Sequence, residues 1–363
     1  MEINCLILSL SLVLAYVYPN KLMFISMVDL KTKYLGIELK NHIIVGASNL
    51  VTKLDTVKRA EQAGAAAIVY KSLFEEQIQL ESAQLDDDLE EYNERNAEMV
   101  KLFPTIEHAG PEEHLVNLRK VKESVNIPVI ASLNAIYKES WVEYARLLEQ
   151  TGVNGLELNF YYVPRDTETD GRDVRNQQVD ILKEIKSNIK IPISVKLSPF
   201  YANPLNIVAL MDKLGVNGFV LFNRMFQPDI DIEKQEHYSP FNLSNPEDHK
   251  LSLRFAGLIY GTINGSICAN TGIYTGVDVV KMILAGADCV QIVSTVYKNK
   301  VEYIATMLKD LEAWMESKKY GKLDDFKGKL SNKKTNDPFV YKRAQYIDLL
   351  LKSDQIFKKY PVV

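Results

Sequence analysis

The sequence of 363 residues is poor in cysteine and in net charge. Its three cysteines, Cys5, Cys268 and Cys289, form no Cys-x-x-Cys pair, so we expect neither a metal site nor an iron–sulfur cluster. Apolar residues flank Cys268 and Cys289, which predicts buried thiols and a cytoplasmic protein. The formal net charge of −4 provides no basic surface for nucleic acid, so we expect no nucleic-acid partner.

The N-terminus lacks the run of about 20 apolar residues that a transmembrane helix needs. Residues 5–18 are apolar, but they follow an acid and no base, unlike a secretory signal. We favour Met27 as the natural start, with residues 1–26 as a mis-assigned extension. The alternative is a membrane-associating N-terminal helix, and N-terminal sequencing of the native protein distinguishes the two. For the rest of the chain we expect no membrane association.

Eight short apolar runs follow one another from His42 onward. Most are continuous rather than alternating, which is typical of strands buried on both faces of a parallel sheet. Hydrophobic residues make up 47% of the chain, enough for one large domain with a buried core. The predicted strands are 42–46, 66–70, 128–132, 155–159, 191–197, 218–222, 265–269 and 289–293.

Amphipathic helical patterns fill the gaps, at 55–64, 139–150, 206–214 and 276–285. A helix that ends at glycine and leads into the next strand recurs four times, as AGAAAI, TGVNGL, LGVNGF and AGADCV. This repeat indicates an α/β fold, and eight such units close into a barrel more often than they form an open sheet. We therefore predict a TIM (β/α)8 barrel over residues 27–317.

Three segments interrupt this rhythm. Residues 73–127 form an insertion after the second strand, and we interpret their acidic run at 86–94 as a solvated helix, with an active-site wall as the alternative. Residues 224–250 are a polar loop after the sixth strand, where we expect a lid. The tail, residues 318–363, is rich in lysine and aromatic residues, which suggests docking on the barrel or on a second subunit.

The functional residues of such a barrel follow its strands. The small residues 45–49 would let a flat ring approach the backbone closely. Lys71 directly follows the second strand, where the alternative is an ordinary surface lysine. Lys196 lies within the fifth strand, where an unpaired charge would be costly, so the two lysines suggest a site that stabilises negative charge.

The last two strands carry the signal for a phosphate group. Residues 270–276 follow the seventh strand and begin a helix, and residues 291–295 follow the eighth. Glycines, hydroxyl groups and a helix N-terminus in these two loops are the usual phosphate cradle of the fold. Together the two loops predict a phosphate-bearing ligand.

From about Val28 to Ser331 the chain resembles the dihydroorotate dehydrogenase family, in particular its bacterial dihydroorotate dehydrogenase-like branch. The resemblance implies a TIM barrel, FMN as cofactor, a small-molecule substrate and a homodimer. The matching stretches follow the family order and are 29–48, 68–72, 155–159, 194–200, 220–224, 271–295 and 319–330.

The resemblance also implies roles for single residues. Lys196 is expected near the flavin N1, where its charge would stabilise the anionic reduced flavin. The other implied contacts are Ala47 and Ser48 beside the ring, Lys71 and Ser72 at the ring and ribityl chain, Asn159 near flavin and substrate, Asn223 in the substrate pocket, and Gly272, Ser294 and Thr295 at the phosphate.

The loop after the fourth strand departs from the family. Soluble members have Asn-Leu-Ser-Cys-Pro-Asn there, and the cysteine is the base that removes the C5 proton. This chain has Asn-Phe-Tyr-Tyr-Val-Pro at 159–164, followed by Arg165, so gapless counting places Tyr162 at the position of the base. A tyrosine hydroxyl ordinarily has a pKa of about 10 and would need strong activation. Tyr161 is the neighbouring candidate.

Two further departures concern substrate and phosphate. Residues 73–127 contain no match to the substrate-binding Asn-Ser-x-Gly-x-x-Asn loop of the family. Thr271 stands where the phosphate loop usually has glycine, and we expect it to alter phosphate binding without abolishing it.

These observations leave three hypotheses. The first is oxidation of dihydroorotate to orotate in pyrimidine biosynthesis, with Tyr161 or Tyr162 as base and Lys196 as the stabilising cation. The second is an FMN oxidoreductase of the same fold with another substrate, which the altered base loop favours. The third is an FMN-binding barrel without efficient catalysis, or a non-redox phosphosugar enzyme, which Lys71 and Lys196 disfavour.

Overall fold

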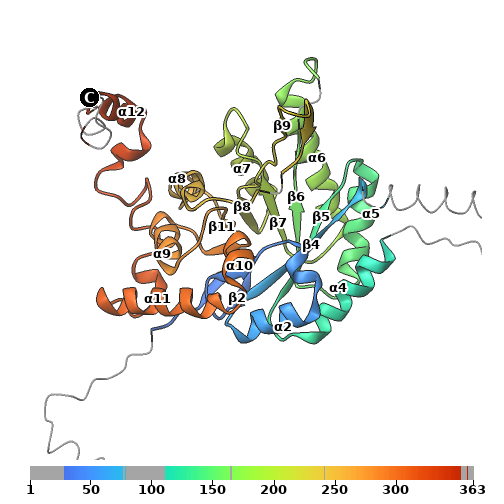
Figure 1. The fold of residues 1–363 in the computed structure, drawn as a ribbon, viewed down its shortest axis with the longest axis horizontal. Coiled ribbons are helices and arrows are strands. Elements are labelled where there is room, and N and C mark those ends of the chain that lie inside the picture. The colour runs from blue at the N-terminus through green and yellow to red at the C-terminus, as the bar shows by residue number, and fades with distance from the viewer. Residues whose placement is uncertain are drawn as a thin grey trace, which may run out of the picture.

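The computed structural model describes residues 28–76, 78, 111–163, 166–240, 242–352 and 358. Eight parallel strands form a closed barrel with helices around it, as Figure 1 shows, so the predicted TIM barrel is confirmed. Each predicted strand overlaps an observed one. The barrel strands are β3 (Ile43–Val45), β4 (Ala67–Phe74), β5 (Val129–Asn134), β6 (Gly155–Asn159), β7 (Ile193–Leu197), β8 (Gly218–Leu221), β11 (Ser266–Asn270) and β12 (Cys289–Ile292).

The helices cover the outside of the barrel and bury the outward-facing side chains of the strands. Apolar residues on both faces of each strand explain why the sequence has continuous apolar runs rather than alternation. The covering helices are α2 (Leu54–Gln62), α4 (Glu112–Ser124), α5 (Lys138–Glu149), α6 (Gly171–Asn188), α7 (Pro204–Lys213), α8 (His249–Ile259), α9 (Gly276–Ala285), α10 (Ser294–Asn299) and α11 (Tyr303–Ser317).

A short hairpin closes the lower end of the barrel, which is the end where the strands begin; no pattern in the sequence predicted it. It consists of β1 (Thr32–Tyr34) and β2 (Ile37–Leu39). Tyr34 and Leu35 are buried inside the barrel together with the predicted buried thiols, Cys268 and Cys289. A Cβ atom added to Gly218, the first residue of β8, would lie 2.7 Å from Leu35 Cδ2. A side chain at Gly218 would therefore push against Leu35, so the hairpin packs closely on β8.

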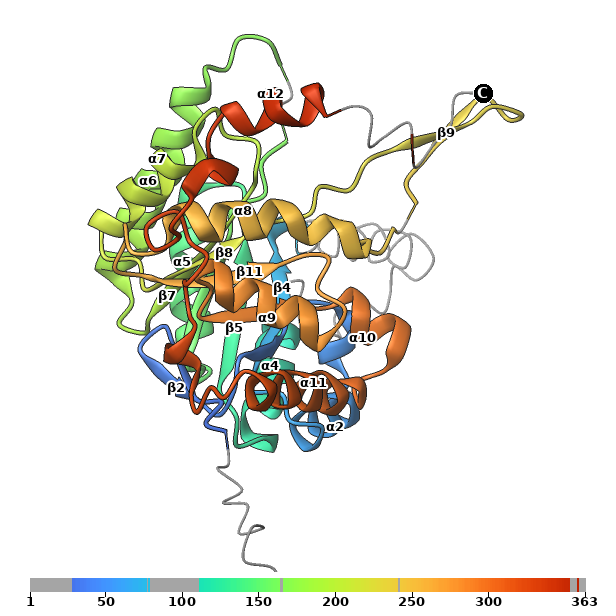
Figure 2. The same cartoon turned by 90° about the vertical axis from the view of Figure 1, so that its left-hand side faces the viewer.

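The segment after β8 leaves the barrel and then returns to it. A second hairpin, β9 (Asp229–Asp231) and β10 (Glu236–Tyr238), extends away from the body, as Figure 2 shows. Residues 242–244 come back to the C-terminal ends of the strands. The segment 224–250, for which we predicted a lid, therefore contributes both a protrusion and part of a cavity wall.

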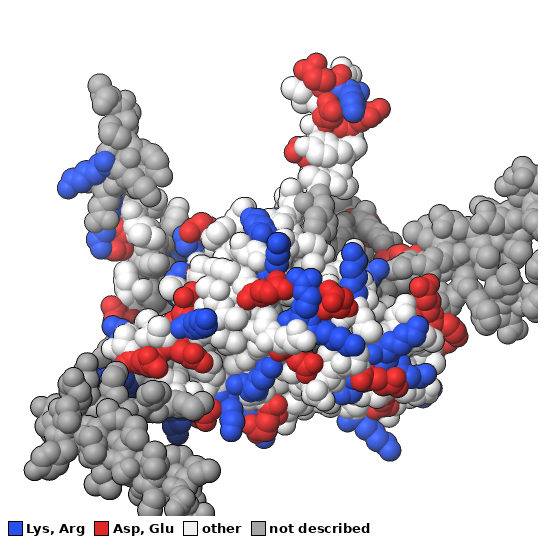
Figure 3. Space-filling view, turned by 60° about the horizontal axis from the view of Figure 1, so that its bottom comes forward, with Lys and Arg blue, Asp and Glu red and all other residues white. Residues whose placement is uncertain are grey.

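The described part of the tail runs over the outside of the barrel. Tyr341, in a short 3-10 helix (Pro338–Tyr341), donates a hydrogen bond to Leu330 O at 2.7 Å. Its ring lies against Gly257 of α8. The last helix, α12 (Ala344–Leu351), buries none of its side chains. On the face shown in Figure 3, acidic and basic side chains are interspersed.

Several predictions concern residues outside the described ranges. These are the N-terminal extension at 1–26, the acidic run at 86–94, and Pro164 and Arg165 in the loop after β6. Of the insertion at 73–127, helix α4 is described. Within the described ranges, no helix is both long and apolar enough to cross a membrane, and no group of three potential ligands could hold a metal ion.

Candidate active site

A cavity of about 460 Å³ lies at the C-terminal ends of the barrel strands. Functional sites of this fold are found at that end, and the volume is in the range of ligand pockets, roughly 300–1,000 Å³. Residues from the loops after several strands line it. Ten of the predicted site residues are among them: Ala47, Ser48, Lys71, Ser72, Asn159, Tyr161, Lys196, Asn223, Gly272 and Ser294.

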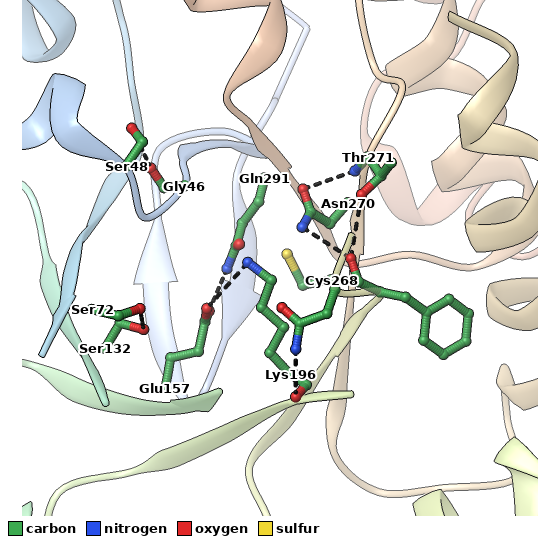
Figure 4. A network of polar contacts seen from close by, with 12 residues as sticks. Gly46, Ser48, Ser72, Ser132, Glu157, Lys196, Cys268, Asn270, Thr271 and Gln291 are labelled. Atoms are coloured by element: carbon green, nitrogen blue, oxygen red, sulfur yellow. Dashed lines mark hydrogen bonds and ion pairs between the residues drawn. The ribbon is translucent and has the colours of Figure 1, made fainter. Parts of the chain in front are cut away.

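Three polar residues form what we call the floor of the cavity: Asn159 on β6, Lys196 on β7 and Gln291 on β12. The strand register places Asn159 beside Lys196, so their side chains emerge at the same level of the barrel. Lys196 is 9% exposed, and its ammonium group points toward Gln291 and a buried carboxylate, Glu157, as Figure 4 shows. The floor thus carries one cation at the edge of a cavity.

The floor also presents hydrogen-bond acceptors. Among the described residues, Asn159 Oδ1 and Gln291 Oε1 are buried and have no hydrogen-bond partner. Buried polar atoms are rarely left without partners, because the loss of solvation is costly. A ligand that offers both donors and acceptors along one edge would satisfy these two atoms and Lys196 together.

Residues at the ends of β3 and β4 form one side of the cavity. A Cβ atom added to Gly46 would lie 2.9 Å from Val293 Cγ2, so a side chain there would push against Val293, which lines the cavity. An irregularity in the pairing of β4 with β5 lies between Val69 and Ser72. Such a bulge re-aims the side chains near it, and Lys71 within it lines the cavity.

The hydroxyl group of Ser72 is engaged within the protein. It shares a hydrogen bond of 2.7 Å with Ser132 Oγ on β5. Both serines are buried, so this bond fixes β4 against β5 below the cavity.

A set of polar groups that we call the serine wall stands where the phosphate was predicted: Ser244, Gly272 and Ser294. Gly272 N donates to Ser244 Oγ at 3.3 Å, and the hydroxyl groups of Ser244 and Ser294 lie 2.8 Å apart. Ser244 N also donates to Ser294 Oγ at 3.0 Å. Three loops thus converge on one small cluster of donors.

The backbone of this wall is unusual. Thr271 and Gly272 have φ angles of +74° and +73°, in the left-handed region that favours glycine. A Cβ atom on Gly272 would overlap the backbone nitrogen of His249. Glycine is therefore required at 272, whereas Thr271 occupies a conformation that its branched side chain disfavours.

The start of helix α9 uses its donors internally. The Asp278 carboxylate accepts hydrogen bonds from Tyr274 N and Thr275 N, both at 3.1 Å. Burial opposes ionisation of Asp278, but its bonds with Lys281, Tyr274 and Thr275 hold the pKa of the carboxyl below its usual value. Tyr274 and Thr275 do not line the cavity, whereas the three residues of the serine wall do.

Thr295 does not line the cavity. It is 1% exposed, and its hydroxyl group donates to Tyr274 O at 3.2 Å and accepts from Asn299 Nδ2 at 3.1 Å. It joins the loops after β11 and β12 and so supports the serine wall from behind.

Three half-buried or exposed residues form what we call the mouth of the cavity: Tyr161, Arg224 and Phe226. The Tyr161 hydroxyl oxygen accepts a hydrogen bond of 3.1 Å from Phe226 N, which joins the loops after β6 and β8. Arg224 donates to Asn242 O and lies over the Phe226 ring, 5.9 Å from its centre.

Only one of the two candidate tyrosines, Tyr161, belongs to the mouth of the cavity. Gapless counting placed Tyr162 at the position of the base, but Tyr161 lines the cavity and Tyr162 is not part of its lining. Phe160, before them, is buried against Trp141 with ring centres 5.1 Å apart. Because Phe160 points into the core, the next residue is directed toward the cavity.

Sequence reasoning missed several residues of this site. Glu157 and Gln291 lie within strands, and a polar residue inside an apolar run is the signal that identified Lys196. The same signal could have found both. Ser244 and Arg224 gave no such signal, because they belong to a long polar loop whose path the sequence does not determine.

Comparison with known proteins supports this architecture. The family model described as "Dihydroorotate dehydrogenase" matches residues 102–315, more than half of the chain. The protein named dihydroorotate dehydrogenase B (NAD(+)), catalytic subunit, of Thermoplasma volcanium is 29% identical over 311 residues, covering 83% of this chain and 98% of the relative. The proteins of that name from Thermoplasma acidophilum and Methanocaldococcus jannaschii are 28% and 26% identical, covering 83% and 74% of this chain and 99% and 87% of the relatives.

Proposed function

Because the chain belongs to the dihydroorotate dehydrogenase family, we propose that it is an FMN-dependent oxidoreductase that binds its flavin in the cavity at the strand ends. The observation that carries this proposal is the floor. A buried lysine and two buried acceptors, which have no partner among the described residues, lie along one side of a cavity of suitable size. The pyrimidine edge of a flavin offers the complementary acceptors and donor.

The rest of the cavity fits the same cofactor. The small side chain of Ala47 lines the cavity and leaves room for a flat ring beside β3. Gly272 N and the hydroxyl groups of Ser244 and Ser294, which bond to one another in this structure, would exchange those bonds for bonds to the phosphate, since donors of this kind bind anions through several short bonds. Lys71 and Ser72 lie beside the ring and the ribityl chain in this arrangement. When bound, FMN supplies the electron-transfer chemistry that these side chains lack.

The chain's own residues would orient the substrate and handle its proton. Lys196 Nζ would stabilise negative charge at the floor. Asn159 and Asn223 would position the substrate between floor and mouth. Tyr161 lines the cavity, and its hydroxyl oxygen accepts a bond from Phe226 N, so this hydroxyl group would be the one that exchanges a proton with the substrate.

We propose dihydroorotate as the first substrate to test, since it gives the family its name. One observation favours a different small molecule. The mouth holds a tyrosine, an arginine and an exposed phenylalanine, and the loop at 159–163 contains no cysteine or serine. We further propose that the protein is a homodimer and that it resides in the cytoplasm. Sedimentation of the purified protein would test the homodimer.

The cofactor is tested by purifying the protein and recording its absorbance. We expect flavin bands and the release of FMN on heating. A colourless protein that cannot be loaded with added FMN would exclude the flavin function. The substrate is then tested by anaerobic mixing with dihydroorotate, where bleaching of the flavin bands is expected if dihydroorotate is the substrate, and no bleaching would point to another one.

The tyrosines provide a matched pair once a substrate is known. Y161F is expected to slow flavin reduction at least about 100-fold, the usual contribution of a general acid or base. Y162F, which differs in a neighbouring side chain outside the cavity, is the control and should stay within about twofold of the wild type. The reverse pattern would return the role to Tyr162.

A further inference from the structure

We propose that Glu157 is a positioning residue for Lys196. Its carboxylate draws the ammonium group below the cavity floor and thereby weakens the stabilisation of negative charge in a bound ligand. The inference rests on the proposed FMN function, in which that negative charge belongs to the reduced flavin.

The carboxylate of Glu157 lies deeper in the barrel than the ammonium group of Lys196. Glu157 lies in the middle of β6, is 0% exposed and does not line the cavity. Lys196, on the adjacent strand, lines the cavity with its side chain 11% exposed. The lysine therefore has a buried carboxylate on one side, as Figure 4 shows, and the cavity that it lines on the other.

The distances show that the lysine is not fixed to the carboxylate. Lys196 Nζ lies 3.8 Å from Glu157 Oε1, too far for a hydrogen bond. Glu157 Oε1 has no hydrogen-bond partner within the described part of the chain, whereas Oε2 accepts a bond of 2.5 Å from Gln291 Nε2. Gln291 thus holds the carboxylate in place, and charge attraction alone orients the ammonium group.

A pair that served folding alone would be expected to be fully hydrogen-bonded, because two buried charges are otherwise a poor source of stability. The geometry observed here suits adjustment instead. In a medium of low dielectric constant, small movements of Lys196 toward the carboxylate or toward the ligand change its electrostatic effect considerably. Glu157 would therefore set how strongly the floor favours the anionic reduced flavin over the oxidised one.

The test is the midpoint potential of bound FMN, measured by spectroelectrochemical titration of the holoenzyme at pH 7. E157Q keeps the shape and removes the charge. We expect it to favour reduced flavin at least tenfold more than the wild type does, a positive shift of about 30 mV for a two-electron couple. K196Q is expected to shift the potential in the opposite direction.

The double variant shows whether Glu157 acts through Lys196. E157Q/K196Q should have the potential of K196Q alone, because the carboxylate then has no cation to draw away. Equal and additive shifts would overturn the proposal. An unchanged potential in E157Q would also overturn the proposal, because the carboxylate would then have no effect on the flavin. A lower potential would overturn it as well, because the carboxylate would then strengthen the effect of Lys196 rather than weaken it.

E75Q is the matched control. Glu75 is also a buried carboxylate, but it bonds to Ile136 N, Tyr137 N and Ser140 and lies outside the cavity lining. The midpoint potential of FMN bound to E75Q should equal that of the wild type.

If E157Q does not fold, E157D is used, and withdrawal of the carboxylate by one methylene group should give a smaller positive shift. No shift in E157D would then overturn the proposal. A wild-type protein that binds no FMN would instead refute the proposed function.

Discussion

The serine wall and the mouth are two sides of one cavity, and they are built in different ways. In the wall, Ser244 is 4% exposed and makes hydrogen bonds to two other loops. At the mouth, Phe226 is 51% exposed, and its backbone nitrogen donates a hydrogen bond to the Tyr161 hydroxyl oxygen. The wall is interlocked with the barrel, whereas the mouth belongs to loops that can change with little effect on the fold.

This difference suggests how such a barrel can keep a cofactor and change its substrate. A substitution in the interlocked wall disturbs several loops together, so it affects both ligand binding and stability. A substitution at the mouth removes contacts that lie near solvent. The four predictions below test this contrast, and they are ordered by the size of the expected effect on stability.

Acid is expected to have the largest effect, and to act on the buried body of the protein. Burial lowers the pKa of His42 to about 4, and burial with the nearby Lys71 charge lowers that of His114 to about 4. Between pH 6.5 and 4 the unfolded chain binds protons that the folded protein does not, so stability falls as the pH falls. By pH 4.5 each histidine should cost about 2 to 3 kcal/mol.

The measurement is the urea midpoint at pH 7, 5.5 and 4.5. H114F keeps a ring against Tyr70, which lies 5.2 Å away in an edge contact, and removes one titrating group. Its loss of stability in acid should be about half that of the wild type. A wild-type midpoint that is unchanged down to pH 4.5 would contradict the prediction.

G272A should break the wall. The added Cβ atom would overlap the backbone nitrogen of His249, and the residue would keep a left-handed φ angle. We expect a loss of about 3 kcal/mol in the free energy of unfolding, together with loss of bound FMN. G171A is the control, because nothing lies within 4 Å of its Cβ position. Full FMN content in G272A would show that the wall does not hold the phosphate.

T271G should strengthen the wall. Glycine tolerates the φ angle of +74° that strains threonine, although it also loses more backbone entropy on folding. We expect a net gain of about 1 kcal/mol in the free energy of unfolding. T271A removes the same hydroxyl contact with Phe222 O without relieving the backbone, and it should not be stabilised. Equal stabilities of the two variants would rule out strain at Thr271.

Y161F should have the smallest effect on stability. The half-buried hydroxyl group gives up one bond with Phe226 N, and solvent can replace it, so the change should be below about 0.5 kcal/mol. FMN content should equal that of the wild type, as equilibrium dialysis would show. A large loss of cofactor in Y161F would mean that mouth and wall are not separate.

The barrel could be predicted because its strands are buried on both faces. Most of the eight strands left a continuous apolar run, and glycine-ended helices marked four of the junctions. The hairpin at residues 32–39 could not be predicted in the same way. Its two strands have three residues each, too few to establish a period.

A site residue could be predicted from the sequence where the end of a single strand determines its position. Lys71, Asn159, Lys196 and Gly272 follow or occupy strands, and the barrel brings them together. The wall also needs Ser244, which meets Ser294 across 50 positions of sequence. Which tyrosine faces the cavity depended on the burial of Phe160 against Trp141, a tertiary contact that counting along the loop does not reveal.

The hairpin that fills the lower end of the barrel has a consequence for the order of events. Because Tyr34 and Leu35 close that end, a ligand on the floor and a ligand at the mouth share one route in and out. The floor must be filled first and emptied last. Saturating amounts of a mouth ligand should therefore slow the departure of whatever the floor holds.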